Sequence, residues 1–437
     1  MIGRCENFVL AMGFALLAGT ELQAQSAYGC TDLNGHHNIP SVEGNNGVFF
    51  RINPDLHMFH SISDESIKQI AKLSEALKAT GTTLIYAPIP TRALAMPNHL
   101  PHIALDYGFQ SELAATVYDD TIRRLSRAQV LTVNLRRALR ISAQNALPFF
   151  ATDPRLTPEG GRQMAAVLAK LISQTDGFEA APKAQFSTTV GAPKIWPSSM
   201  RNNLQRHCML KLPEVKASEH VTTTLQASLG TTSNSIFGSQ ANSLRIALVG
   251  TDVTGSPVSN LAGALSQETG FDVVKYSVAD GGSFAAISSY LTSSTFQEVR
   301  PAYLIWANPI DNNLAQFGDQ PMRELTAATA SRCRISLPFT RGATPQSIRA
   351  KLNGLDAAQP YTLYLDTGGA NASEVRFDFT SRQGLVQSKH VIRHPDQVKT
   401  GRFYMPLSGL WREGAQTVDV SLDVPFGPNA RISACFD

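Results

Sequence analysis

Apolar runs of strand length alternate with segments of helical periodicity along most of the chain, and this alternation limits the possible folds most strongly. Residues 82–87 have the composition of a buried strand, and they follow residues 63–80, where apolar side chains recur at helical spacing. Residues 112–128 repeat the helical pattern before a second strand-like run at residues 130–134. Strands that alternate with helices form parallel sheets with helices on both faces. The sequence therefore predicts an α/β fold with a mainly parallel sheet.

The alternation continues in the second half of the chain after one interruption. Residues 174–242 are rich in Ser, Thr, Gln and Pro and carry only short apolar pieces, so we expect a long surface excursion there. Strand-like runs resume at residues 244–250, 271–278 and 302–307. We expect these strands to complete the sheet of one domain over residues 25–322.

The pattern changes from Cys333 onward, where short runs alternate between apolar and polar residues. A period of two is typical of antiparallel strands that turn one face toward a core. Clear examples are residues 361–365, 375–379 and 418–424. We expect a C-terminal antiparallel β-sandwich over residues 323–437.

The N-terminus has the features of a secretory signal peptide. The basic residue Arg4 precedes a mostly apolar run at residues 8–18, and residues 22–24 form a small-residue cleavage pattern. The apolar run is too short to span a bilayer. We therefore expect residues 1–24 to be removed and the mature protein to be soluble and exported.

Four cysteines remain once Cys5 has left with the signal peptide, and an even number in an exported chain argues for disulfides. Three connectivities are possible. The positions favour Cys30 with Cys208, which would tie the mature N-terminus to the middle of the chain, and Cys333 with Cys435, which would bracket the terminal module. A zinc site is the rival interpretation, but no CxxC motif or clustered histidine accompanies these cysteines, so we expect no metal.

The polar stretch at residues 152–160 has the layout of a catalytic arm. It lies before a helix that begins near Pro158, and Asp153 and Arg155 have the spacing of the Asp-x-His pair of Ser/His/Asp hydrolases. Arginine stays protonated and has no acceptor atom, so Arg155 cannot take a proton from a serine. The stretch therefore lacks the general base that such a catalytic pair requires.

Several motifs, in their order along the chain, resemble one family. This stretch, within residues 150–160, resembles its TDxHWTPxG signature, and the other motifs lie at residues 47–50, 88–101, 248–252, 260–263, 280–284 and 304–309. Together they are similar to the SGNH-hydrolase-like periplasmic polysaccharide O-acetyltransferases of alginate acetylation, of AlgX/AlgJ type. The terminal β module and the cysteine pairing favour the AlgX-like branch, which carries a carbohydrate-binding module. The resemblance implies a periplasmic protein with an SGNH-like fold and no cofactor.

The resemblance also assigns positions to a catalytic triad. Asp153 matches the family Asp, whereas Arg155 stands where His is expected and Asp252 where the nucleophilic Ser is expected. Neither substitute can perform the acyl-serine chemistry. An arginine between two acids favours both ionised forms, so we expect Asp153, Arg155 and Asp252 to converge as a non-catalytic, ion-paired cluster at the end of the parallel sheet.

A relocated nucleophile is the alternative, and it would require a hydroxyl and a histidine within hydrogen-bond reach. The simpler interpretation of the available residues is that they are loop hydroxyls and surface or core histidines. Gly250 and Gly282, beside the oxyanion in the family, are equally well explained as strand-to-helix turn glycines. The candidates for a relocated site are Thr254, Ser256, Ser283, His99, His102 and His207.

The terminal module has its own charge balance. Residues 331–437 hold thirteen Lys and Arg against nine Asp and Glu, a larger positive surplus than the +3 of the whole chain, which is too small to argue for nucleic acid. Arginine forks bind carboxylates and aromatic rings support sugar faces, so a polyuronate is the expected ligand. The alternative is a basic surface with aromatics in the core. The candidate ligand-binding residues are Arg341, Arg402, Tyr404, Trp411 and Arg412.

Three functions follow. The first is an exported protein of alginate or exopolysaccharide biosynthesis and O-acetylation that binds acidic polysaccharide without catalysing the transfer, beside a membrane-bound acyltransferase or export complex. The second is an active O-acetyltransferase or esterase with a relocated nucleophile. The third is a scaffold of an export complex with no glycan contact.

Overall fold

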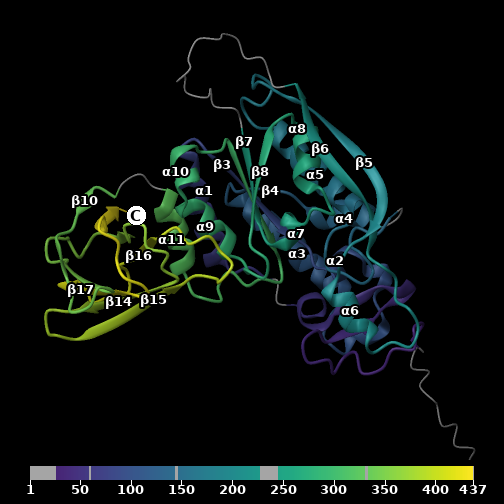
Figure 1. Cartoon of the computed structure of the whole chain (residues 1–437), viewed down its shortest axis with the longest axis horizontal. Coiled ribbons are helices and arrows are strands. Elements are labelled where there is room, and N and C mark those ends of the chain that lie inside the picture. Colours follow the sequence, from purple (N-terminus) through teal and green to yellow (C-terminus); the bar gives the residue numbers. More distant parts are fainter. Residues whose placement is uncertain (1–25, 59–60, 143–145, 227–244, 330–332, 437) are drawn as a thin grey trace, which may run out of the picture.

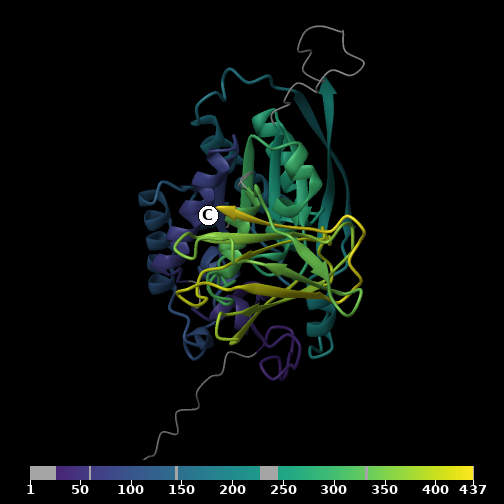
Figure 2. The same ribbon diagram turned by 90° about the vertical axis from the view of Figure 1, so that its left-hand side faces the viewer.

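The computed structural model describes residues 26–58, 61–142, 146–226, 245–329 and 333–436. The expected signal peptide lies outside the described residues. An α/β part and a β-rich C-terminal part lie side by side (Figure 1), and the strands of the second part stand in front of the first in the perpendicular view (Figure 2). No helix in these described ranges combines the length and the apolarity that crossing a membrane requires.

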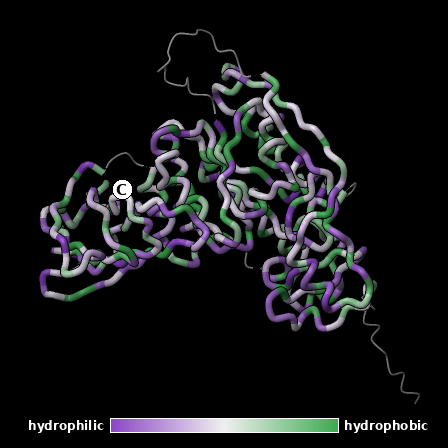
Figure 3. The backbone as a smooth tube through the Cα atoms, viewed as in Figure 1, coloured by the Kyte–Doolittle hydropathy of each residue, from purple (hydrophilic) through white to green (hydrophobic). Residues whose placement is uncertain are grey.

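The α/β part is built on five parallel strands in the order β4-β3-β9-β7-β8. This confirms the predicted mainly parallel sheet, and the hydrophobic segments of Figure 3 run through it. The parallel pairing brings the carboxyl ends of all five strands to one edge. Their bounds are β3 Thr83–Ile89, β4 Leu131–Thr132, β7 Arg245–Gly250, β8 Asp272–Ser277 and β9 Tyr303–Pro309.

Helices cover both faces of this sheet, as the sequence predicts. Successive strand residues point to opposite faces, so that Ile85 packs with α3, α5 and α8, whereas Leu84 and Tyr86 pack with α1, α9 and α11. Polar caps fix where helices begin: the Ser63 and Thr157 side chains accept from the backbone N–H of Ser66 and Gly160. The helices are α1 Asp64–Lys78, α3 Ser111–Arg127, α4 Leu135–Ser142, α5 Pro158–Ser173, α8 Leu261–Thr269, α9 Ala285–Thr292 and α11 Gln320–Thr329.

The expected surface excursion contains a two-stranded antiparallel ribbon, formed by β5 (Gln185–Ile195) and β6 (Lys216–Gln226). Hydrogen bonds such as Asn260 Nδ2 to Thr222 Oγ1, at 2.9 Å, hold the ribbon on α8. In the sequence, helix α6 (Ser199–Gln205) and then Cys208 follow β5 and precede β6. Residues 227–242 of the excursion lie outside the described residues.

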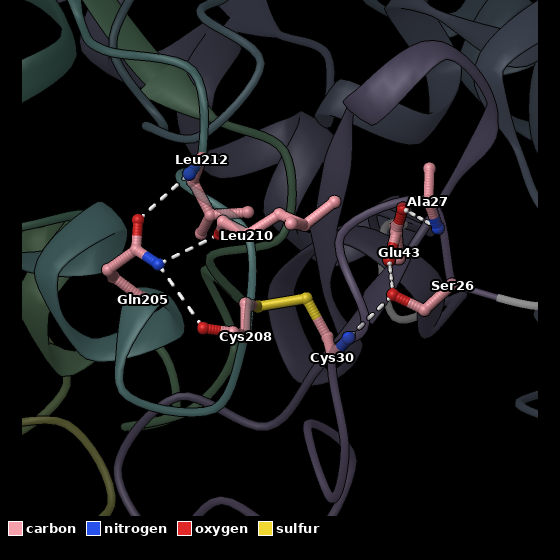
Figure 4. The surroundings of a disulfide bond; sticks show 8 residues. All are labelled: Ser26, Ala27, Cys30, Glu43, Gln205, Cys208, Leu210 and Leu212. Carbon is pink, nitrogen blue, oxygen red and sulfur yellow. Dashed lines mark hydrogen bonds between the residues drawn. A yellow bond between two sulfur atoms is a disulfide. The ribbon is translucent and has the colours of Figure 1, made fainter.

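Both expected disulfides are present. Cys30 bonds to Cys208, and Gln205 holds the turn around Cys208 through the backbone of Cys208, Leu210 and Leu212 (Figure 4). Cys333 bonds to Cys435. Disulfides of this kind are typical of exported proteins.

The C-terminal part is the expected antiparallel β sandwich. One sheet has the strand order β10-β18-β13-β16 and the other β11-β12-β17-β14-β15, and side chains from both sheets share one apolar core. The strands are β10 Ile335–Ser336, β11 Phe339–Arg341, β12 Ser347–Lys351, β13 Tyr361–Asp366, β14 Glu374–Thr380, β15 Val386–Ile392, β16 Arg402–Pro406, β17 Thr417–Leu422 and β18 Arg431–Phe436.

The two parts share a buried interface that is centred on one ion pair. Strand β16 packs on α11, and Tyr404 and Cys435 belong to the apolar cluster of the α/β part. Both nitrogens of the Arg393 fork donate to Glu324, with Nη1 to Oε2 at 3.0 Å, and these two side chains are 6% and 3% exposed. A buried carboxylate that is paired in this way fixes the relative position of the two parts.

We expect Arg393→Ala to lower the free energy of unfolding by about 3–5 kcal/mol, because Glu324 would stay buried without its counter-charge. Urea denaturation measures this loss. In the matched control Arg349→Ala, which breaks the exposed pair of Arg349 with Asp419, the loss should be below about 1 kcal/mol. The double variant Glu324→Leu/Arg393→Met should recover most of the stability. Equal losses in the two single variants would contradict a special role for the buried pair.

Candidate functional site

A cavity of about 850 Å³ opens at the carboxyl edge of the parallel sheet. The segments that follow β3, β7, β8 and β9 all contribute to its wall, as does the loop before α5. Ligands of open α/β sheets bind at this edge, because the loops that leave neighbouring strands diverge there. The charged residues of the wall are Arg51, Asp55, Arg92, Asp153, Arg155, Asp252, Asp280 and Asp311.

Asp153 and Arg155 form an ion pair in the wall of the cavity. The backbone N–H of Arg155 and its Nε donate to Asp153 Oδ1 at 2.9 and 2.7 Å, and Nη2 donates to Oδ2 at 2.9 Å. Arg155 Nη2 also donates to the carbonyl oxygen of Pro197 at 2.6 Å. Three donors of Arg155 thus converge on the carboxylate of Asp153, which is 3% exposed.

Asp252 lies in the same cavity but outside this pair. It is the first residue of the short helix α7 (Asp252–Gly255), directly after β7. Burial and the neighbouring carboxylate of Asp280 raise the pKa of Asp252, and the charge that offsets them comes from Arg51. Arg155 and Asp252 form no ion pair among the described contacts. The prediction that Asp252 joins the ion pair of Asp153 and Arg155 is therefore wrong, because the guanidinium of Arg155 is directed toward Asp153 and Pro197.

Arg51 and Asp55 form a second pair that sequence reasoning missed. Strands β1 (Ser41–Glu43) and β2 (Phe49–Arg51) make a hairpin, and a single helical turn, Ile52–Leu56, follows it. The backbone N–H and the Nε of Arg51 donate to Asp55 Oδ2 at 2.9 and 3.3 Å. Burial opposes the charge of Asp55, yet Arg51 and Arg92 hold the pKa of Asp55 below its usual range. The signal was available, since Arg51 directly follows a family-like motif at residues 47–50.

Arg92 is a buried cation in the cavity wall, with 1% of its surface exposed. Its Nη2 donates to the carbonyl oxygens of Phe150 and Ala151 at 2.7 and 3.0 Å, whereas its Nε has no hydrogen-bond partner. Burial lowers the pKa of Arg92 to about 10. Arg92 thus ties the end of β3 to the loop that carries Asp153. A charged residue just after a buried strand was the sequence signal for it.

Asp311 adds a carboxyl group with unusual acidity. It follows β9, and burial raises its pKa to about 6, with Arg51 opposing the shift and Asp55 and Asp252 adding to it. Asp280 lies on the exposed rim, in a left-handed backbone conformation with φ of 52°. Asp252 therefore stands in a cavity wall that carries several other carboxyl groups.

The candidates for a relocated nucleophile are not brought together with a histidine. Ser256 and Ser283 are buried, and the hydroxyl groups of both lack a hydrogen-bond partner. The hydroxyl of Thr254 donates to the carbonyl oxygen of Thr251 at 2.7 Å. None of these three residues lines the cavity, and no histidine does so in the part of the chain that the structure describes.

The histidines lie elsewhere. His99 contacts the carbonyl oxygen of Asn45, His102 begins a short 3-10 helix, and the ring of His207 lies 4.9 Å from that of His36. Gly250 is required by packing, since a Cβ there would collide with the carbonyl oxygen of Ala307. Gly282 has a positive φ of 59°, as turn glycines often do.

The five candidate glycan-binding residues do not form one surface. Tyr404 is 5% exposed and packs at the interface with the α/β part, so its ring has no free face for a sugar and the expectation for Tyr404 is wrong. Arg402 donates to the carbonyl oxygen of Thr292 at 3.1 Å, also across the interface. Trp411 packs half-buried against the sandwich core. Arg412 and Arg341 are exposed, although Arg341 also donates to Gly427 O at 3.0 Å.

A family model described as "SGNH hydrolase-like domain, acetyltransferase AlgX" matches residues 42–310. The chain belongs to this family. It is 29% identical over 276 residues to the alginate biosynthesis protein AlgX of Pseudomonas aeruginosa, covering 63% of this chain but only 56% of that relative. It is 24% identical over 291 residues to the probable alginate O-acetylase AlgJ of Pseudomonas putida, covering 64% of this chain and 72% of that relative.

Solved structures give the same fold. The structure of Pseudomonas aeruginosa AlgX superposes with a TM-score of 0.75 at 21% identity and covers 91% of this chain and 94% of its own. The O-acetyltransferase domain of Pseudomonas putida AlgJ superposes with a TM-score of 0.51 at 19% identity, covering 65% of this chain and 98% of its own. The AlgX superposition extends over nearly the whole chain, as the predicted two-part architecture requires.

We expect Asp311→Asn to change how stability depends on pH. The folded-state pKa of about 6 exceeds the ordinary value of 3.8, so the folded protein holds a proton that the unfolded chain releases between these values. This group therefore makes the unfolding free energy fall as pH rises through that window. The unfolding free energy of the variant minus that of the parent should therefore be larger at neutral pH than at a pH of about 4.

Urea denaturation at both pH values measures this difference. The control Asp176→Asn changes an exposed carboxyl group outside the cavity and should follow the pH dependence of the parent. An Asp311→Asn variant with the same pH dependence as the parent would show that Asp311 titrates normally.

Proposed function

We propose that the protein is an exported, periplasmic AlgX-like component of alginate or exopolysaccharide biosynthesis and O-acetylation, which binds acidic polysaccharide and does not itself catalyse acetyl transfer. The observation that carries the proposal is the contact geometry of Arg155. The resemblance assigns Arg155 to the position of the family base and Asp252 to that of the nucleophile, and the guanidinium of Arg155 is paired with Asp153. A carboxylate there could form only a mixed anhydride, and Arg155 cannot accept a proton.

The terminal module supports the binding part of the proposal. Its surplus of basic residues includes Arg412 and Arg341, which are exposed, whereas Arg349 and Arg376 are held by Asp419 and Asp378. Exposed guanidinium groups bind carboxylates through paired hydrogen bonds, and one carboxylate recurs on every sugar of a polyuronate. The partners in this proposal are the polymer and a membrane-bound acyltransferase or export complex that acts on it.

We expect no turnover of a chromogenic acetyl ester by the purified protein. The double variant Arg155→His/Asp252→Ser supplies a base and a nucleophile in the family positions, and its hydrolysis rate should exceed that of the ester in buffer at least about a hundredfold. Each single variant should stay inactive, since one partner would be missing. Absorbance of the released alcohol measures the rate.

The second candidate function, a relocated nucleophile, has a distinct outcome. Turnover by the parent that Ser256→Ala or Ser283→Ala abolishes, and that Asp252→Asn leaves unchanged, would overturn the non-catalytic assignment. Circular dichroism of each variant separates loss of activity from loss of folding.

We expect isothermal titration with oligomannuronate to give binding that weakens as salt is added, because the contacts are between exposed charges. The variant Arg341→Ala/Arg412→Ala should bind about tenfold more weakly. Arg349→Ala/Arg376→Ala removes the same charge from residues that are already paired, so it should have a smaller effect. Absence of binding to several acidic oligosaccharides would favour a scaffold without glycan contact.

A further inference from the structure

We infer that the cavity at the carboxyl edge of the sheet binds a sugar that carries a free amine, held by the carboxylates of Asp252, Asp280 and Asp311. This inference rests on the proposed function in one respect, namely that the cavity carries out no acetyl-serine chemistry. It concerns a different ligand from the acidic polymer proposed for the terminal module.

The residues that line the cavity include more carboxyl groups than guanidinium groups. Five carboxyl groups and three guanidinium groups line it, so its full ionisation leaves two negative charges in excess. Asp153 is neutralised by Arg155, and Asp55 by Arg51. The three remaining carboxyl groups, those of Asp252, Asp280 and Asp311, belong to no ion pair among the described contacts.

The buried cation Arg92 does not neutralise these three carboxyl groups. Its Nη2 is directed to two backbone carbonyl oxygens and its Nη1 to the sulfur of Met200, at 3.8 Å. Arg92 lines the cavity at 1% exposure, and its Nε has no partner. Arg92 therefore makes no ion pair with the three carboxyl groups among the described contacts.

The chemistry of the walls selects among sugars. A uronate would add negative charge to a cavity that already has an excess, and like charges placed close together repel. A neutral sugar would satisfy hydrogen bonds but leave the excess in place. A sugar ammonium satisfies both requirements, because its N–H groups donate to carboxylates while its hydroxyl groups bond to the polar groups of the cavity wall.

The electrostatics of the carboxyl groups agree with this selection. Burial and repulsion between carboxyl groups raise the pKa values of Asp252 and Asp311, with Arg51 opposing both shifts. Asp280 contributes to the shift of Asp252, and Asp55 and Asp252 contribute to that of Asp311. An ammonium between them would favour their ionised forms. The cavity volume of about 850 Å³ also lies within the range of small-molecule sites.

Isothermal titration of the full mature chain with three short oligosaccharides of equal length tests the inference. The probes are oligoglucosamine with free amines, the same oligomer fully N-acetylated, and oligomannuronate. We expect oligoglucosamine to bind at least about tenfold more tightly than its N-acetylated form, since acetylation removes one ion pair. Asp252→Asn and Asp280→Asn should each weaken oligoglucosamine about tenfold.

The matched control Asp176→Asn removes an exposed carboxylate outside the cavity and should leave the affinity unchanged. Asp280 is exposed, so its variant remains informative even where Asp252→Asn fails to fold. Equal affinity for the amine and the N-acetylated oligomer, no binding of the amine, or binding that both cavity variants leave intact would each overturn the inference. The proposed function fails on other readouts, which are ester turnover and oligomannuronate binding.

Discussion

Parallel pairing of β3, β9 and β7 is the constraint on which the rest of this protein depends. Parallel strands need crossover connections, and these connections are the helices that cover both faces of the sheet. The same pairing gathers the ends of the strands at one edge. Asp252, Asp280 and Asp311 follow three different strands, and they share one cavity only because those strands run in the same direction.

The electrostatics of that edge differ from those of a hydrolase triad. A triad needs a base that gains and loses a proton. Here the guanidinium of Arg155, which stays protonated, pairs with Asp153 two residues earlier in the same loop. The cation that opposes the raised pKa of Asp252 is Arg51 rather than Arg155. The cavity therefore carries fixed charges and an excess of carboxyl groups.

The terminal sandwich is joined firmly to this arrangement. The buried pair of Glu324 and Arg393, together with Tyr404, connects α11 to the sandwich, and hydrogen bonds such as Ser289 Oγ to Val398 O at 2.7 Å add to the contact. A basic residue or an aromatic ring in this module therefore has two possible uses, surface or interface. Arg402 and Tyr404 lie at the interface, whereas Arg341 and Arg412 are exposed.

The sequence by itself determined the strands of the sheet, the antiparallel sandwich and the family, because periodicity and motif order are properties of the chain. The cysteine positions favoured one of three possible pairings, and the structure contains that pairing. The sequence also placed Asp153, Arg155 and Asp252 at one site. Only the tertiary structure decided which charges pair. A guanidinium is long enough to reach several partners, so its orientation depends on neighbours such as Pro197 that lie far away in sequence. For the same reason, Arg51, Arg92 and Asp311 became part of the site only once distant segments had packed together.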